Sequence, residues 1–142
     1  MVVALLLTTA TLSAQLRLAS PIADGMVLLQ SSEAKLWGEA ASGATISVTT
    51  SWDNLTHTTK ADKSGRWELS VATPEGGYTP YSIHFSDGKE QIAVGDVLIG
   101  EIWLASGQSN MEMPLRGFFN SPVEGANRVF ACPAGGDHVR MF

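Results

Sequence analysis

The stretch Val97–Leu115, VLIGEIWLASGQSNMEMPL, decides how the rest of the chain is interpreted. Its first part, Val97–Ala105, is mostly apolar and is interrupted only by Gly100 and Glu101. This pattern predicts a strand buried on both faces, as in the parallel sheet of an α/β domain. Small and polar residues with a central glycine follow it. Sites in open α/β sheets collect beyond the carboxyl ends of the strands, so Ser109 is a candidate nucleophile.

Ser109 also fits a purely structural role as the N-cap of a helix. With Glu112 three residues later it matches a capping box, in which the serine side chain accepts a backbone amide hydrogen and the glutamate reaches back. Pro114 would break a longer helix, because proline lacks an N–H and its ring clashes with the preceding turn. Any helix that starts at Ser109 is therefore predicted to be about one turn long. Both roles of Ser109 stay open at this point.

The same stretch resembles the nucleophile block of the sialate O-acetylesterase family, within the SGNH (GDSL-like) hydrolases. The resemblance covers about nineteen residues and centres on Gly107–Met111, GQSNM. It implies that Ser109 is the nucleophile, that its backbone N–H is one oxyanion-hole donor, and that the reaction removes O-acetyl groups from sugars without a metal or cofactor. Met111 stands where the nucleophile elbow of α/β-hydrolases needs glycine, which argues against that fold.

The neighbours of Ser109 and a downstream aromatic pair are candidate substrate contacts. The resemblance extends to a Gly-Phe-Phe-Asn segment, which could wall a substrate pocket; the alternative is that its two phenylalanines fill a core. A short helix is predicted around residues 123–130. The candidate substrate-binding residues are Gln108, Asn110, Met111, Phe118, Phe119 and Asn120.

Composition narrows the classes of function. Hydrophobic residues make up 44% of the 142-residue chain and charged residues 16%, as in globular proteins. The net charge is −5 and there is no basic cluster, which argues against nucleic acid as a partner. The single cysteine, Cys132, cannot form a disulfide within the chain, and no zinc-ligand spacing, phosphate loop or dinucleotide fingerprint is present. Nothing in the sequence bears on the oligomeric state.

The first residues, Met1–Ala14, form an apolar run that ends in small residues. The run predicts a secretory signal peptide cleaved after Ala14, and hence a secreted or periplasmic protein. It lacks a basic residue near Met1, and Leu12 occupies a position that usually holds a small residue. The run is too short to span a bilayer as a helix. The alternative interpretation is a hydrophobic first strand.

Residues 15–95 show the period-two alternation of strands with one buried face. The pair Asp87-Gly88 predicts a hairpin with a primed two-residue turn, and the spacing of turns predicts a β-sandwich of seven or eight strands. The resemblance implies the same N-terminal β-domain. Trp37 and Trp67 are predicted to be core residues, whereas Trp52 and Tyr78 lie beside loops and are the better candidates for ligand contact. His57 and His84 are predicted to be solvated strand residues.

The predicted organisation is a β-sandwich over residues 15–95 followed, over 96–142, by the beginning of an SGNH-type, flavodoxin-like α/β domain. A serine hydrolase needs a general base, usually a histidine held by an aspartate. The resemblance places that histidine, and the remaining oxyanion-hole residues, in blocks far downstream, and His138 does not match their position. The chain is therefore expected to be an N-terminal fragment that is inactive alone. The alternatives are a non-catalytic carbohydrate-binding or docking module, and a structural sandwich with Ser109 as a helix cap.

Overall fold

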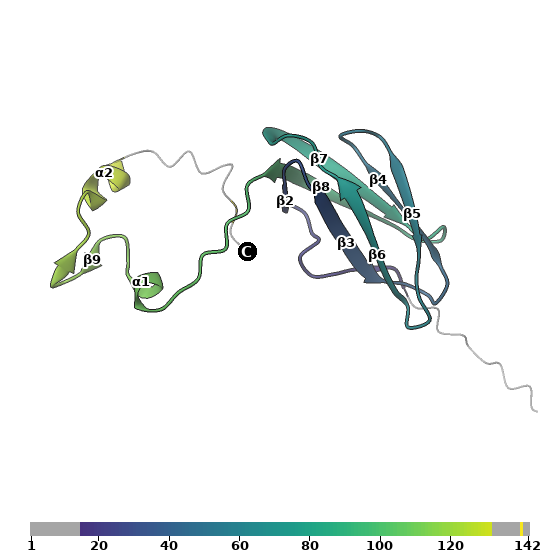
Figure 1. Cartoon of the computed structure of the whole chain (residues 1–142), viewed down its shortest axis with the longest axis horizontal. Coiled ribbons are helices and arrows are strands. Elements are labelled where there is room, and N and C mark those ends of the chain that lie inside the picture. The colour runs from purple at the N-terminus through teal and green to yellow at the C-terminus, as the bar shows by residue number, and fades with distance from the viewer. Residues whose placement is uncertain (1–14, 132–139, 141–142) are drawn as a thin grey trace, which may run out of the picture.

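The computed structural model describes residues 15–131 and residue 140, and strands dominate it (Figure 1). The predicted signal peptide, Cys132 and His138 lie outside the described residues. Two short helices and a small hairpin follow the strands. The strands of the β-domain are β1 (Arg17–Leu18), β2 (Val27–Leu29), β3 (Glu33–Glu39), β4 (Thr45–Thr50), β5 (Thr56–Lys60), β6 (Arg66–Ala72), β7 (Gly77–Ser86) and β8 (Gln91–Gly100).

These strands form two sheets around one hydrophobic core. The three-stranded sheet has the order β1-β3-β6, and the five-stranded sheet has the order β2-β8-β7-β4-β5. All neighbours pair antiparallel except β2 and β8, which pair parallel, so the larger sheet is mixed. Figure 1 shows the two sheets curling around each other. The predicted β-rich N-terminal part is confirmed.

The core follows the alternation that the sequence predicts. Ile46 and Val48 on β4, Trp67 on β6 and Ile83 and Phe85 on β7 are almost fully buried, and both sheets contribute to the same cluster. Trp67 packs against Phe85 with a ring-centroid distance of 6.0 Å. Residues two apart in a strand share a face, so the polar residues between these positions face solvent.

The hairpin between β7 and β8 forms as predicted, but with a longer turn. Ser86 pairs with Gln91, so four residues connect the strands instead of two. The carboxylate of Asp87 accepts hydrogen bonds from the backbone amides of Glu90 (2.7 Å) and Lys89 (2.8 Å). These bonds lower the pKa of Asp87 below its usual range, and Gly88 supplies the positive φ of 85°. An aspartate that binds its own turn therefore favours the longer loop.

The prediction that Trp37 is a core residue is wrong, because Trp37 lies on the outer face of β3. Leu36 and Gly38 are the buried residues on either side of it, whereas Trp37 is 42% exposed. A Cβ atom on Gly38 would lie 2.8 Å from Cζ2 of Trp67 and 2.1 Å from the carbonyl oxygen of Arg17. Glycine is thus an inward-facing residue here, and its missing side chain leaves the space that the indole of Trp67 occupies.

The structure also shows where the other aromatic residues and the histidines singled out from the sequence lie. Trp52 is partly buried, stacks edge-on against Tyr81 at 5.8 Å, and donates its indole N–H to the carbonyl oxygen of Ala72 at 3.0 Å, so it is a packing residue. Tyr78 is exposed. His84 is exposed as predicted. His57 differs, because its Nε2 atom is buried and has no hydrogen-bond partner among the described residues.

The predicted strand Val97–Ala105 is wrong in extent and in surroundings. Residues 97–100 are the end of β8, paired with β2 on one side and with β7 on the other. Val97, Leu98 and Ile99 are buried there, which explains their continuous apolar run. Residues 101–107 form no helix or strand and are exposed. The buried apolar residues therefore belong to the last strand of the β-domain. Separately, no helix in the described part of the chain is long and apolar enough to cross a membrane.

Candidate active site

Ser109 is the first residue of α1 (Ser109–Glu112), a helix of a single turn. Gln108 is the N-cap residue, and no side chain caps the helix. The predicted capping box of Ser109 with Glu112 is therefore wrong: the serine lies one position too late to cap, and its hydroxyl bonds no described residue. Ser109 is exposed. A hydroxyl that is free of structural hydrogen bonds is available for chemistry.

The predicted length of this helix is confirmed, and Pro114 explains it. Met113 ends α1 in an extended conformation, with φ −67° and ψ 118°, as expected of a residue that precedes proline. At the other end, a Cβ atom on Gly107 would lie 3.1 Å from Cγ of Met111. Glycine before the turn thus lets Met111 fold back over the backbone next to Ser109. The sequence Gly107–Met111 and Pro114 together limit Ser109 to one tight turn.

The downstream candidates lie on a small hairpin. The strands β9 (Gly117–Phe118) and β10 (Ser121–Pro122) pair antiparallel, so Phe119 and Asn120 form its tip. Phe118 is half exposed and Phe119 is fully exposed. Within the described part of the chain, these phenylalanines therefore fill no core. The predicted short helix forms as α2 (Ala126–Ala131).

Among residues 15–131 and 140, no histidine and aspartate join Ser109 in a catalytic triad. Of the candidate substrate-binding residues, Gln108, Asn110 and Met111 adjoin Ser109 in and before α1, while the other three lie on the β9–β10 hairpin. Neither His57 on β5 nor His84 on β7 bonds Ser109. No group of three or more histidine, cysteine or acidic side chains among residues 15–131 and 140 is arranged to hold a metal ion.

Several large apolar side chains near Ser109 in the sequence are exposed to solvent. Ile102, Trp103 and Leu104 precede Ser109, and Trp103 and Leu104 are 85% and 94% exposed. Met111 and Leu115 follow Ser109 and are about half exposed. Figure 1 shows this part of the chain projecting from the end of β8, away from the two sheets. Large exposed apolar side chains that lie close together in the sequence are typical of regions that contact other groups.

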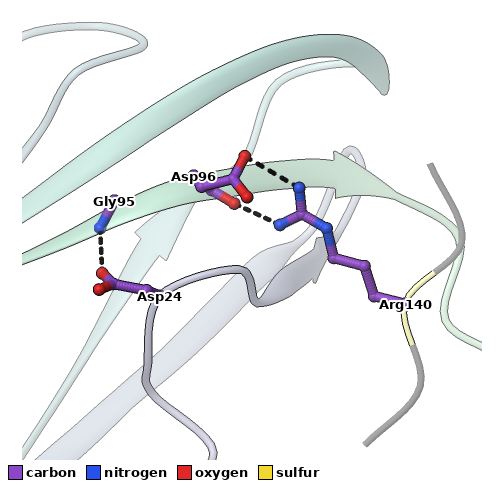
Figure 2. Close-up of polar contacts among 4 residues, drawn as sticks. All are labelled: Asp24, Gly95, Asp96 and Arg140. Carbon is purple, nitrogen blue, oxygen red and sulfur yellow. Dashed lines mark hydrogen bonds and ion pairs between the residues drawn. The ribbon is translucent and has the colours of Figure 1, made fainter. Parts of the chain in front are cut away.

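Arg140 brings the chain back to the β-domain, a contact that no sequence pattern indicated. Its guanidinium donates one hydrogen bond to the carbonyl oxygen of Asp96 and another to the Asp96 carboxylate at 2.9 Å (Figure 2). Asp96 has a φ of 53° and lies at a bulge, because β8 has one residue more than β7 between the pairs Tyr81–Val97 and Ile83–Val94. Beside it, the Gly95 amide donates to the Asp24 carboxylate at 2.7 Å.

Comparison with known proteins first identifies a class. The fold is similar to that of a carbohydrate acetylesterase from Xanthomonas citri, with a TM-score of 0.64 and 36% identity, over 71% of this chain and 23% of that one. The sequence is, further, 35% identical to the human sialate O-acetylesterase over 120 residues, and 35% identical to the rat sialate O-acetylesterase over 135 residues. No protein-family model matches the sequence.

These matches cover 78% and 89% of this chain, and they confirm the resemblance to the sialate O-acetylesterases. The chain spans about a quarter of the length of these curated relatives, 23% of the human protein and 24% of the rat protein. The chain is therefore related to the sialate O-acetylesterases over most of its own length.

Proposed function

We propose that this chain carries the nucleophile of a carbohydrate esterase that removes O-acetyl groups from sugars, and that Ser109 is that nucleophile. The observation that carries the proposal is an exposed serine hydroxyl, unused as a helix cap, at the start of a one-turn helix within Gly107–Met111. The relationship to sialate O-acetylesterases and to a carbohydrate acetylesterase supports the same chemistry. The proposed substrate is an O-acetylated carbohydrate, and the proposed location is secreted or periplasmic.

The proposed reaction proceeds in two halves through an acetyl-serine. The Ser109 Oγ attacks the acetyl carbonyl carbon while a general base takes its proton, and the backbone N–H of Ser109 donates to the developing oxyanion. The tetrahedral intermediate then collapses: the bond between the acetyl carbon and the sugar oxygen breaks while the protonated base gives its proton to that oxygen. The sugar leaves as an alcohol. Water attacks the acetyl-serine by the same route, which releases acetate and restores Ser109.

The general base in this proposal is a histidine in the part of the relatives' length that this chain does not span. His57 and His84 lie within the large sheet, on β5 and β7, and supply no base to Ser109 in the structure. The exposed Trp103, Leu104 and Met111 support the same arrangement, because the remainder of an SGNH-type domain would cover them. The division into a β-sandwich and the beginning of that domain is part of the proposal, with the change at the end of β8.

The test compares Ser109→Ala with Ser106→Ala in a protein of the relatives' full length. Both serines are exposed and only three residues apart, so Ser106→Ala controls for local disturbance. We expect Ser109→Ala to reduce hydrolysis of p-nitrophenyl acetate by about 10³-fold or more, and Ser106→Ala to leave it within about twofold. Equal rates for Ser109→Ala and the unmodified protein would remove Ser109 from the mechanism.

The 142-residue chain alone is expected to be inactive in this proposal. Without a base, the Ser109 hydroxyl remains a weak nucleophile at neutral pH. We expect background hydrolysis and no labelling by a fluorophosphonate probe. Stoichiometric labelling of Ser109 in this chain would show that the chain supplies its own base.

A further inference from the structure

The outer face of the small sheet carries an exposed tryptophan and several charged side chains. Residues opposite each other in antiparallel strands point to the same face. Trp37 lies opposite Glu68, and Glu39 lies opposite both Arg17 and Arg66. All five side chains therefore share the solvent-facing side of β1, β3 and β6, which is opposite to the core.

This face is hollowed into an open groove of about 740 Å³. That volume is in the range of small-molecule sites in proteins, about 300–1,000 Å³. Charged side chains and Trp37 line the groove together with Leu18, Ala19, Gly38 and Trp67; the charged residues are Arg17, Glu39, Asp62, Arg66 and Glu68. The groove lies on the β1-β3-β6 sheet, whereas Ser109 lies beyond the end of β8, so the two sites are separate (Figure 1).

Several charged groups in this groove have unused hydrogen-bonding capacity. Arg17, Glu39 and Arg66 make no side-chain hydrogen bond or ion pair with any residue that the structure describes. Among the described residues, the Glu68 carboxylate pairs with Lys35 alone, at 2.9 Å, and that pair is exposed. The groove therefore presents both donors and acceptors together with the Trp37 side chain.

We propose that this groove is a non-catalytic binding site for a neutral saccharide, with Trp37 as its stacking platform. A sugar ring has an apolar C–H face that packs on an aromatic ring, and a rim of hydroxyls that both donate and accept. Arg17 and Arg66 supply donors to those hydroxyls, and Glu39 and Glu68 supply acceptors. The site uses no residue of the Ser109 region.

The charged residues that line the groove favour a neutral sugar over an anionic one. Two cations, Arg17 and Arg66, and three anions, Glu39, Asp62 and Glu68, line the groove, so its lining carries no excess of positive charge. An anionic ligand is recognised by arginines without competing carboxylates, and Glu39 and Glu68 would repel it. A protein partner fits less well, because the centres of protein interfaces are depleted in charged residues and burying unpaired charges is costly.

Titration of the protein with xylohexaose and cellohexaose by calorimetry tests this proposal, with sialyllactose as the anionic comparison. The probes carry no acetyl ester, so the result does not depend on Ser109 or on esterase activity. We expect saturable binding of at least one neutral hexaose, weakened about tenfold or more by Trp37→Ala and partly restored by Trp37→Phe. Sialyllactose should bind more weakly than the neutral hexaose.

Tyr78→Ala is the matched control, because Tyr78 is an exposed aromatic residue of the same domain that does not line the groove. It should bind the hexaoses like the unmodified protein, and circular dichroism should show all variants folded. Absence of binding to both hexaoses, unchanged binding by folded Trp37→Ala, loss of binding by Tyr78→Ala, or preference for sialyllactose would overturn the proposal.

Discussion

At the residue scale, the most informative position is Gly38. Nothing in the sequence indicates that the glycine next to Trp37 faces the core, and the size of Trp37 favours Trp37 as the core residue instead. In the structure the glycine faces inward because Trp67 occupies the space of its missing side chain. The indole of Trp67 is almost fully buried at this contact. The absent Cβ of Gly38 thus leaves room for Trp67 in the core, while strand alternation places Trp37 on the opposite face.

Gly38→Ala should therefore destabilise the β-domain. The new Cβ would overlap the Arg17 carbonyl oxygen, a backbone atom that cannot move without disturbing the β1–β3 pairing. Overpacking of this kind typically costs about 1–3 kcal/mol, and we expect the upper part of that range. Urea unfolding followed by tryptophan fluorescence measures it. Gly77→Ala, where nothing lies within 4 Å of the new Cβ, should stay within about 0.5 kcal/mol; equal losses for both would contradict the packing argument.

At the scale of elements, the chain after β8 consists of short units set by single residues. Helix α1 stops at Met113 because Pro114 follows, and the β9–β10 hairpin depends on Gly117. Gly117 has a φ of 77°, and a Cβ atom there would lie 2.3 Å from the carbonyl oxygen of Ser121. These units have little buried surface of their own, so their local backbone geometry carries more of their stability than packing does.

Gly117→Ala should open the β9–β10 hairpin, and Gly125→Ala is its matched control. Both glycines have a φ of 77°, but nothing lies within 4 Å of a Cβ at Gly125. The difference between the variants therefore isolates the steric clash from the cost of positive φ, which is about 1 kcal/mol at either site. We expect trypsin to cleave after Arg116 several-fold faster in Gly117→Ala than in Gly125→Ala. Similar rates at that bond would show that the hairpin is not held by this close approach.

At the scale of the whole molecule, the described residues fall into two kinds of structure. Residues 15–100 bury a shared core between two sheets, whereas residues 101–123 expose large apolar side chains such as Trp103, Leu104 and Phe119. Most of the large apolar side chains of the β-domain are thus buried, whereas those in the region of Ser109 are exposed. The ion pair of Arg140 with Asp96 links a residue beyond both parts to the β-domain, but Asp96 is exposed, so we assign the pair less than about 1 kcal/mol.

A chain ended at Gly100 should therefore fold by itself and bind less of the dye ANS than the 142-residue chain. It retains both sheets and the whole core cluster, and it loses the exposed apolar residues around Ser109. Circular dichroism should show a cooperative thermal transition for both chains, and ANS fluorescence should be several-fold lower for the shorter one. An unfolded shorter chain, or equal ANS binding, would show that residues after Gly100 complete the β-domain.

The sequence by itself determined the strands of the β-domain and the segment that carries the candidate nucleophile. Alternation places Ile46, Val48, Ile83 and Phe85 in the core because the period of two is a local property of extended backbone. The motif Gly107–Met111 and Pro114 are also local, so the one-turn helix and the family resemblance could both be predicted. The capping role of Ser109 could not be settled, because it depends on a shift of one residue in where the helix begins.

Only the tertiary structure decided that the apolar residues 97–100 belong to the β-domain. Residues 97–100 have the composition of a buried parallel strand, and they are one, but their parallel partner is β2, about 70 residues earlier in the chain. The groove at Trp37 likewise depends on the register of β1, β3 and β6, and the pair of Arg140 with Asp96 depends on the return of a distant segment. Pairing between remote segments leaves no periodicity in either one, because it is selected by burial and hydrogen bonding in the folded molecule.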